Sequence, residues 1–294
     1  MKIGLVDVDY KIRKPFPNIA LMKISKYHKN KGDFVELANI GNYDILYYSK
    51  IFTFSKEKSN LLLFGNKIIK GGIGYKKFNK LPDYIDKLCP DYSLYNCEHA
   101  YGFLSRGCIR KCDHCVVPIS EGNIQPNQDI EEFLENKKSA ILMDNNILSF
   151  DYGLQQIEKI IKLGVSVDFN QGLDARIISE NKEISELLSK VKWLHPLRMA
   201  CDHKSQMESI LKATKLLRYY GATPKQYFCY VLVKDIEDAL ERVTFLKKLN
   251  IDAFAQPYIN FEDGFVDKKL KKFARWVNCK QLRNVEWKDY KYSS

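Results

Sequence analysis

The most informative segment of this chain is Cys108-Ile109-Arg110-Lys111-Cys112-Asp113-His114-Cys115. Its three cysteines have the spacing C-x3-C-x2-C, so three thiolates can converge within one tight loop. Thiolates select zinc or iron–sulfur clusters. A structural zinc site closes its coordination shell with a fourth ligand, whereas three cysteines on a 4Fe–4S cluster leave one iron atom open. The loop therefore predicts a metal centre, and the number of ligands distinguishes its two possible forms.

Together with Gly102-Phe103-Leu104-Ser105-Arg106-Gly107, which precede it, the loop resembles the signature of the radical S-adenosylmethionine (SAM) superfamily. That family has a cysteine triplet at the end of the first barrel strand and an aromatic residue before the last cysteine, where this chain has His114. The resemblance implies a 4Fe–4S cluster on Cys108, Cys112 and Cys115. It also implies that the open iron binds the amino and carboxylate groups of SAM, with His114 beside the adenine.

The same resemblance implies an enzyme that reductively cleaves SAM to a 5′-deoxyadenosyl radical, which abstracts a hydrogen atom from a substrate. An electron donor such as flavodoxin or ferredoxin is the implied partner, and the sequence does not identify the substrate. The residues leave open a non-enzymatic zinc or iron–sulfur binding protein, because cysteine spacing alone does not separate metals. In the zinc form, His99 or His114 would be the fourth ligand.

Beyond residue 100, short apolar runs alternate six times with amphipathic stretches. The predicted strands are 100–106, 139–144, 165–170, 193–200, 226–233 and 251–258. The predicted helices are 127–138, 151–163, 179–190, 204–220, 235–249 and 266–277. Six βα units are too few for an eight-stranded barrel, and they match the partial (β/α)6 TIM-type barrel that the resemblance implies. We therefore predict an α/β fold in which residues 100–294 form this barrel with a C-terminal helical tail.

Ligands bind at the carboxyl ends of the strands in parallel α/β sheets, so polar residues at those ends are candidate cofactor-binding residues. In chain order they are Asp144, Asn145, Gln171, Asp174, Arg176, Arg198, Asp202 and Gln256. None is assigned a catalytic role. The resemblance implies an acidic residue in this part of the chain that touches SAM or the substrate, and Asp202 occupies that place. Gln256 is a candidate for contact with the adenine or the substrate.

Local alternatives exist for some of these candidates. Asp144 supplies an acceptor for the methionine amine, but Asp144 or Asn145 can equally cap the following turn. Arg176 suits the SAM carboxylate because a guanidinium pairs with a carboxylate fork. Asp174 and Arg176 can instead form a local structural ion pair.

The first 80 residues predict a separate small parallel α/β domain, with strands at 2–8, 34–38 and 44–48 and a helix from Pro17 to Tyr27. They resemble the Rossmann-like cobalamin-binding domain that precedes the barrel in one radical SAM branch, and Gly71-Gly72-Ile73-Gly74 resembles its glycine turn. The base-off cobalamin motif Asp-x-His-x-x-Gly is absent. We expect a degenerate domain that binds no cobalamin. Residues 81–99, with Pro82 and Pro90, are the predicted linker.

The composition of the 294-residue chain is globular, with 45% hydrophobic and 13% aromatic residues. The amino terminus reaches Asp7 too early for a signal peptide, and no apolar run is long enough to cross a bilayer. We therefore expect a cytoplasmic protein without membrane contact. In that compartment, eight cysteines favour metal binding over disulfides.

The net charge of +11 is concentrated at the two ends of the chain. Residues 1–100 have 17 Lys and Arg against 10 Asp and Glu, and residues 267–294 have 9 against 3. Residues 101–266 have 21 against 23. An enzyme that modifies tRNA or another nucleic acid is therefore an alternative. A lysine-rich solvated surface explains the same composition more simply, so nucleic acid is not the favoured partner.

Overall fold

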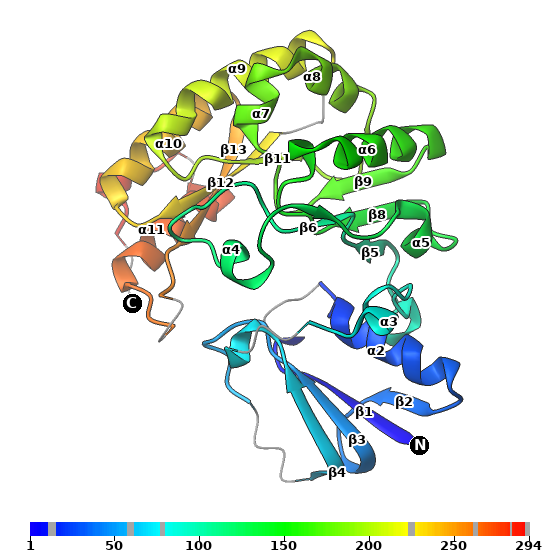
Figure 1. Cartoon of the computed structure of the whole chain (residues 1–294). Coiled ribbons are helices and arrows are strands. Elements are labelled where there is room, and N and C mark those ends of the chain that lie inside the picture. Colours follow the sequence, from blue (N-terminus) through cyan, green and yellow to red (C-terminus); the bar gives the residue numbers. More distant parts are fainter. Residues whose placement is uncertain are drawn as a thin grey trace. The chain divides into compact units, whose positions relative to one another are not determined.

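The computed structural model describes residues 1–10, 16–57, 62–76, 80–222, 227–260, 264–282 and 284–291. The chain has an α/β fold with parallel sheets and divides into two compact units (Figure 1). The first unit is mainly residues 1–102 and 128–140, and the second is mainly residues 103–127, 141–260 and 265–294. No helix in the described ranges has both the length and the apolar character that a bilayer crossing requires.

The first unit contains a four-stranded parallel sheet in the order β2-β1-β3-β4. Its strands are β1 (Lys2–Asp7), β2 (Phe34–Leu37), β3 (Gly41–Ser49) and β4 (Leu63–Gly71). Helix α2 (Ile19–Asn30) connects β1 to β2 and begins where the Asn18 side chain accepts a hydrogen bond from Leu21 N. Ile3, Leu5 and Ile24 are among the buried residues of this core. The predicted strand–helix–strand order is confirmed, and β4 is an additional strand.

The glycine turn follows β4 directly. Gly72 has φ +107°, and a Cβ there would lie 2.2 Å from the carbonyl oxygen of Lys50. Glycine is therefore required here by close packing against the backbone at the end of β3.

The remaining elements of the first unit are short. They are α3 (Asp83–Asp86), the 3-10 turn Tyr92–Leu94, β5 (Ala100–Gly102) and α5 (Ile130–Leu134). A capping box at Asp129 and Glu132 starts α5, and α5 ends sooner than the predicted helix 127–138. Phe133 of α5 is fully buried against Gly102, where any Cβ would lie within 2.6 Å of its ring.

Two further sheets contain β5 and the strands from β8 onward. Their orders are β10-β9-β8-β5 and β11-β12-β13, and a parallel bridge pairs Leu173 with Met199. The strands are β8 (Ser139–Leu142), β9 (Ser166–Phe169), β10 (Lys192–Trp193), β11 (Leu197–Ala200), β12 (Tyr227–Val233) and β13 (Ile251–Pro257). The predicted strands are confirmed, except that two of them are divided. The predicted strand 100–106 forms β5 and β6 (Ser105–Arg106), which lie in different sheets, and 193–200 forms β10 and β11. The described residues form no closed barrel.

Helices alternate with these strands and cover one side of them (Figure 1). They are α6 (Asp151–Leu163), α7 (Ala175–Glu180), α8 (Lys182–Ser189), α9 (Met207–Tyr219), α10 (Ile236–Lys248) and α11 (Lys268–Asn278). The bounds of α6 are those predicted, and the predicted helix 179–190 begins earlier, as two helices. Asn181 separates them because its side chain caps α8 by accepting from Ile184 N.

Candidate functional site

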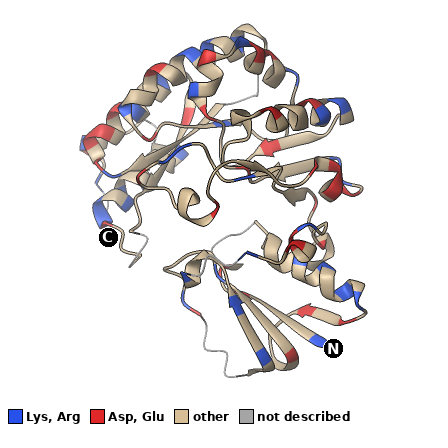
Figure 2. Ribbon diagram, viewed as in Figure 1, with Lys and Arg blue, Asp and Glu red and all other residues tan. Residues whose placement is uncertain are grey.

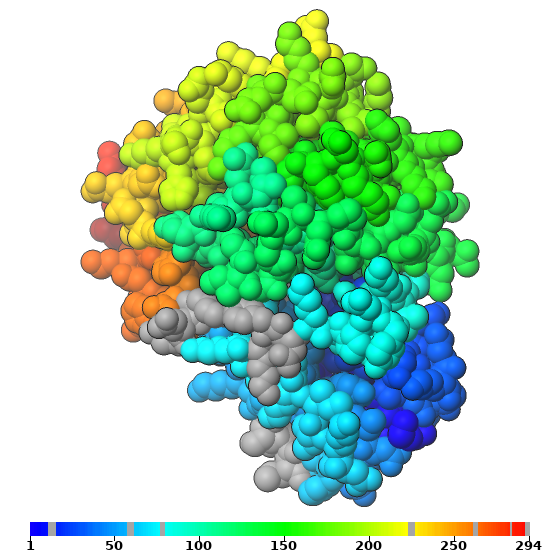
Figure 3. Space-filling model, viewed as in Figure 1, coloured from blue at the N-terminus to red at the C-terminus, as the bar shows by residue number. Residues whose placement is uncertain are grey.

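The cysteine loop is held in shape by backbone contacts. It leaves β6 (Ser105–Arg106), which pairs antiparallel with β7 (Gln125–Pro126), and it ends at α4 (Val117–Ser120). Gly107 has φ +80°, and a Cβ there would lie 2.1 Å from the carbonyl oxygen of Asn123. Cys108 N donates to Gly122 O at 3.2 Å. The teal segment of Figure 3 that includes this loop reaches the surface of the second unit.

Glu121 ties the start of the loop to its end. Its carboxylate accepts hydrogen bonds from Gly107 N at 2.8 Å and from Arg106 Nη1 at 3.1 Å. The predicted candidate Asn145 also donates to Glu121, from Nδ2 at 3.0 Å. In this structure Asn145 therefore supports the loop through Glu121.

Asp144 fixes the backbone ahead of the loop. The carboxylate is buried and accepts from Leu104 N, Ser105 N and Ser105 Oγ at 3.3, 2.5 and 2.6 Å. Burial raises the pKa of Asp144 to about 6, although the hydrogen bonds from Ser105 and Leu104 act in the opposite direction. The Asp144 side chain thus binds the preceding strand connection and does not cap the following turn.

The three thiols of Cys108, Cys112 and Cys115 are half-buried. Burial raises the pKa of Cys112 and of Cys115, and the Arg176 guanidinium acts against this at Cys112. In the described part of the chain, no set of three ligands within 4.8 Å of one another includes any of these cysteines. A tetrahedral zinc ion with Zn–S bonds of about 2.3 Å requires sulfur atoms about 3.8 Å apart. Among the described residues, the three thiols are therefore not gathered as closely as around one zinc ion.

Asn146 connects the first cysteine to the segment after β9. Its Nδ2 lies 3.7 Å from Cys108 Sγ and 3.2 Å from Asp174 Oδ2. Its Oδ1 is buried and has no hydrogen-bond partner among the described residues. Because a buried acceptor without a donor is costly, this oxygen is suited to a ligand that donates an N–H or O–H.

Asp174 lies between two arginines beside the same cysteines. It accepts from Arg110 Nε at 2.9 Å and from Arg176 Nε at 2.8 Å. Burial would raise the pKa of Asp174, but the hydrogen bonds and charges of Arg176 and Arg110 outweigh burial and lower it. The local ion pair between Asp174 and Arg176 therefore forms, and Arg176 also interacts electrostatically with Cys112 and Cys108.

His114 and Asp202 are also brought together. His114 Nε2 lies 3.7 Å from Asp202 Oδ2, and His114 Nδ1 lies 3.1 Å from Asp113 Oδ1. Lys234 Nζ lies 2.8 Å from Asp113 Oδ2. These contacts attach the cysteine loop to the residues that follow β11 and β12. His99, the other histidine considered for zinc, hydrogen-bonds Ser139 in the first unit.

The other predicted residues are not in this cluster of contacts. Arg198 binds the buried Asp168 through Nε and Nη2, both at 2.8 Å, and its Nη1 lies 3.4 Å from Tyr230 Oη. Gln171, after β9, and Gln256, on β13, are exposed. Arg198 thus has a structural carboxylate partner, and within the described ranges neither glutamine makes a hydrogen bond or ion pair with the cysteines.

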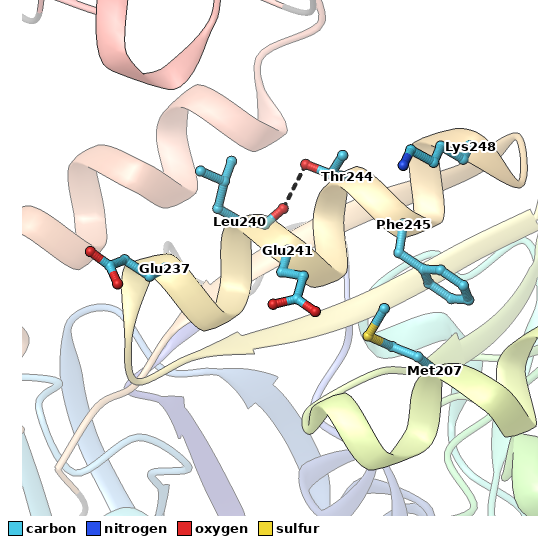
Figure 4. A pocket seen from close by; sticks show the side chains of 7 residues that line it. All are labelled: Met207, Glu237, Leu240, Glu241, Thr244, Phe245 and Lys248. Atoms are coloured by element: carbon cyan, nitrogen blue, oxygen red, sulfur yellow. Dashed lines mark hydrogen bonds between the residues drawn. The ribbon is translucent and has the colours of Figure 1, made fainter.

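A shallow groove of about 450 Å³ lies elsewhere, on the outer helices. Figure 4 shows that it is formed by α10 and the start of α9. Its lining residues are Met207, Glu237, Leu240, Glu241, Thr244, Phe245 and Lys248. None of the predicted site residues lines this groove.

Sequence reasoning missed Glu121, Asn146 and Arg110 as parts of the site. Arg110 lies between the first two cysteines, so its position was a usable signal for a cation beside the thiolates. Glu121 and Asn146 had no such signal, because their partners are contacts formed only in the fold. No protein-family model and no curated protein sequence matches this chain.

Proposed function

We propose that this chain is a radical SAM enzyme that holds one 4Fe–4S cluster on Cys108, Cys112 and Cys115. The observation that carries the proposal is the C-x3-C-x2-C loop of three half-buried thiols, beside which the Arg176 guanidinium interacts electrostatically with Cys112 and Cys108. Cysteine thiolates hold 4Fe–4S clusters, and three of them leave one iron for another ligand. When bound, the cluster supplies the electron that cleaves SAM to methionine and a 5′-deoxyadenosyl radical.

The residues around Cys108 have the chemistry that the amino acid end of SAM requires. Asn146 Oδ1 is a buried acceptor without a donor in the described ranges, which suits the amino group. Arg176 uses Nε and Nη2 for Asp174. Its Nη1 is the guanidinium nitrogen without a hydrogen bond to a described residue, and it suits the carboxylate. Asp174 orients Arg176 and Asn146 together, so one side chain positions both.

The adenine end of SAM is assigned to the opposite side of the loop. His114 is mostly buried, with 17% of its side chain exposed, and Asp202 lies beside it. A flat imidazole offers a stacking surface, and the Asp202 carboxylate offers an acceptor for ribose hydroxyls or for the substrate. The contacts of Asp113 with Lys234 hold the loop, and His114 with it, near the ends of β11 and β12.

The strand order supports a partial (β/α)6 barrel as the finer description of the fold. The strands β5, β8 and β9 are consecutive neighbours in one sheet, and β11, β12 and β13 are consecutive neighbours in the other. The bridge between Leu173 and Met199 joins the two sheets in parallel. Neighbouring strands in chain order with helices on one side are typical of a barrel built from βα units.

The direct test is anaerobic reconstitution of the chain with iron and sulfide, followed by incubation with SAM and dithionite. We expect about four iron and four sulfide per chain for one 4Fe–4S cluster, with release of methionine and 5′-deoxyadenosine. Cys112→Ala should lose both the iron and the cleavage. Cys279→Ala is the matched control, because Cys279 is half-buried at the end of α11 and its removal should change neither.

A second candidate, a zinc-binding protein without enzymatic activity, predicts a different result. The chain would retain one zinc per molecule, would remain colourless after reconstitution and would release no 5′-deoxyadenosine. That result would exclude the proposed function.

All eight cysteines are free thiols, which fits the reducing cytoplasm in which flavodoxin or ferredoxin would supply electrons.

A further inference from the structure

Helix α11 has five cations and no acid in its sequence KKLKKFARWVN. Its apolar side packs on β13, where Phe273 and Ala274 are buried. Asn278 closes this contact, since its Oδ1 accepts from Ala255 N at 2.8 Å and its Nδ2 donates to Ala255 O at 3.0 Å. The cations therefore lie on the remaining side, and Lys and Arg predominate along α11 in Figure 2.

This arrangement is electrostatically unfavourable for the isolated chain. Lys268 and Lys272, four residues apart, repel each other on one helix face, as do Lys271 and Arg275. Lys268 and Lys269 also lie in the first turn, where the helix dipole disfavours cations.

Some cations of the other helices in the second unit have a carboxylate partner four residues away. Lys190 lies 2.9 Å from Glu186 in α8, and Lys212 lies 2.7 Å from Glu208 in α9. Within the described ranges, no carboxylate is within 4.0 Å of any of the four α11 lysines, which are Lys268, Lys269, Lys271 and Lys272. The positive charge of these four lysines is therefore available to a partner.

The residues after α11 extend this positive surface. The ring of Trp287 packs on Phe273, with centroids 5.1 Å apart, which holds the tail against α11. Lys272 Nζ lies 5.6 Å from the ring of Tyr290. We call the cations of this region, which are exposed except for the half-buried Lys272, the α11 cationic surface. It consists of Lys268, Lys269, Lys271, Lys272, Arg275, Lys280, Lys288 and Lys291.

We propose that the α11 cationic surface binds the phosphate backbone of a nucleic acid, which is then the class of macromolecule that the enzyme modifies. A polyanion removes the repulsion among the α11 cations and releases counterions. An anionic membrane is the weaker fit, because interfacial helices insert an apolar face and that face of α11 is buried on β13. The assignment as a substrate rests on the proposed function, but the docking is testable without it.

The test is fluorescence anisotropy of a labelled 24-nucleotide single strand of mixed sequence, titrated with the full chain at several salt concentrations. The variant replaces Lys268, Lys271, Lys272 and Arg275 with glutamine, a good helix former. The matched control replaces Lys182, Lys190, Lys212 and Lys215, exposed cations of α8 and α9, with glutamine. Both variants lose four positive charges. A difference between them therefore reports where the charges lie and not the change in net charge.

We expect the α11 variant to bind at least tenfold more weakly than the control at about 100 mM salt. Its slope of log K against log salt should be smaller by about 3, since each phosphate contact on a single strand contributes about 0.7. Equal losses in the two variants would overturn the proposal. Binding to vesicles of phosphatidylcholine with phosphatidylserine that is as tight as binding to the single strand, and that also depends on α11, would overturn it as well.

An assay of SAM cleavage without substrate tests the proposed function separately from the docking surface. The α11 variant should cleave SAM at the rate of the unsubstituted chain, because its four substitutions lie on α11 and leave the cysteine loop, residues 108–115, unchanged. Loss of α11-dependent binding with intact cleavage would overturn only the docking surface. Binding that depends on α11 in a chain that never cleaves SAM would support the surface and overturn the proposed function.

Discussion

Asn146 holds its amide nitrogen 3.7 Å from the sulfur of Cys108 and leaves its buried Oδ1 without a partner among the described residues. The first atom can stabilise a thiolate, and the second requires a donor from a ligand. One side chain thus links the proposed cluster to the proposed SAM contact.

Asn146→Ala should weaken SAM binding to the reconstituted protein. A hydrogen bond contributes about 0.5–1.5 kcal/mol, so the dissociation constant should rise by about 2- to 12-fold in equilibrium dialysis. Asn145→Ala is the control, because Asn145 bonds Glu121 and should leave SAM affinity of the loaded fraction unchanged. Equal affinity in the Asn146 variant and the unsubstituted protein would remove Asn146 from the ligand site.

Gly107→Ala should prevent cluster assembly. The added Cβ would overlap the carbonyl oxygen of Asn123 at 2.1 Å, and Gly107 also has φ +80°. Gly122→Ala is the matched control, because Gly122 has φ +79° but nothing within 4 Å of the added carbon. The control should cost only the left-handed backbone strain of about 1 kcal/mol. Iron content after reconstitution should be low in the first variant and normal in the second; similar iron in both would show that the turn at Gly107 tolerates change.

Asp144 should make the stability of the fold depend on pH between about 4 and 6. Its folded pKa of about 6 lies above its ordinary value of 3.8, so the folded state binds the proton more tightly than the unfolded state. Stability is therefore highest below the unfolded pKa and falls as pH rises through 6. At 1.36 kcal/mol per pKa unit, the total change is about 3 kcal/mol.

Urea unfolding of the cluster-free protein at a series of pH values measures this change. Asp144→Asn should be less stable overall, because one of its amide atoms cannot accept from Leu104 and Ser105. It should also lack the extra loss of stability between pH 4 and 6. Parallel curves for the two proteins would mean that Asp144 is ionised throughout this range.

Periodicity explains why most of the fold could be predicted from the sequence. The apolar positions of α6 and the apolar runs of β12 and β13 mark these elements, since each buries one face. Strand β4 lacks this signal, because Gly65, Asn66 and Lys67 interrupt it and most of its residues are at least partly exposed. The predicted helix 127–138 was longer than the helix observed there, since α5 covers only Ile130–Leu134.

The site could be predicted only where its residues are neighbours in the sequence. The three cysteines and Arg110 lie within eight positions. The contacts of Asp144 with Leu104 and Ser105, and of Asn146 with Asp174, join residues 28 to 40 positions apart. No spacing rule encodes such pairs, so polar residues at strand ends could be identified as candidates but not assigned partners.

The most direct test of the central claim is the electron paramagnetic resonance spectrum of the reduced, reconstituted protein with and without SAM. An iron that lacks a protein ligand is open to SAM, so we predict a reduced 4Fe–4S signal whose g values change when SAM is added. Cys279→Ala should behave in the same way. A reduced cluster whose spectrum is identical with and without SAM would contradict the account, as would a protein that holds zinc and gives no signal.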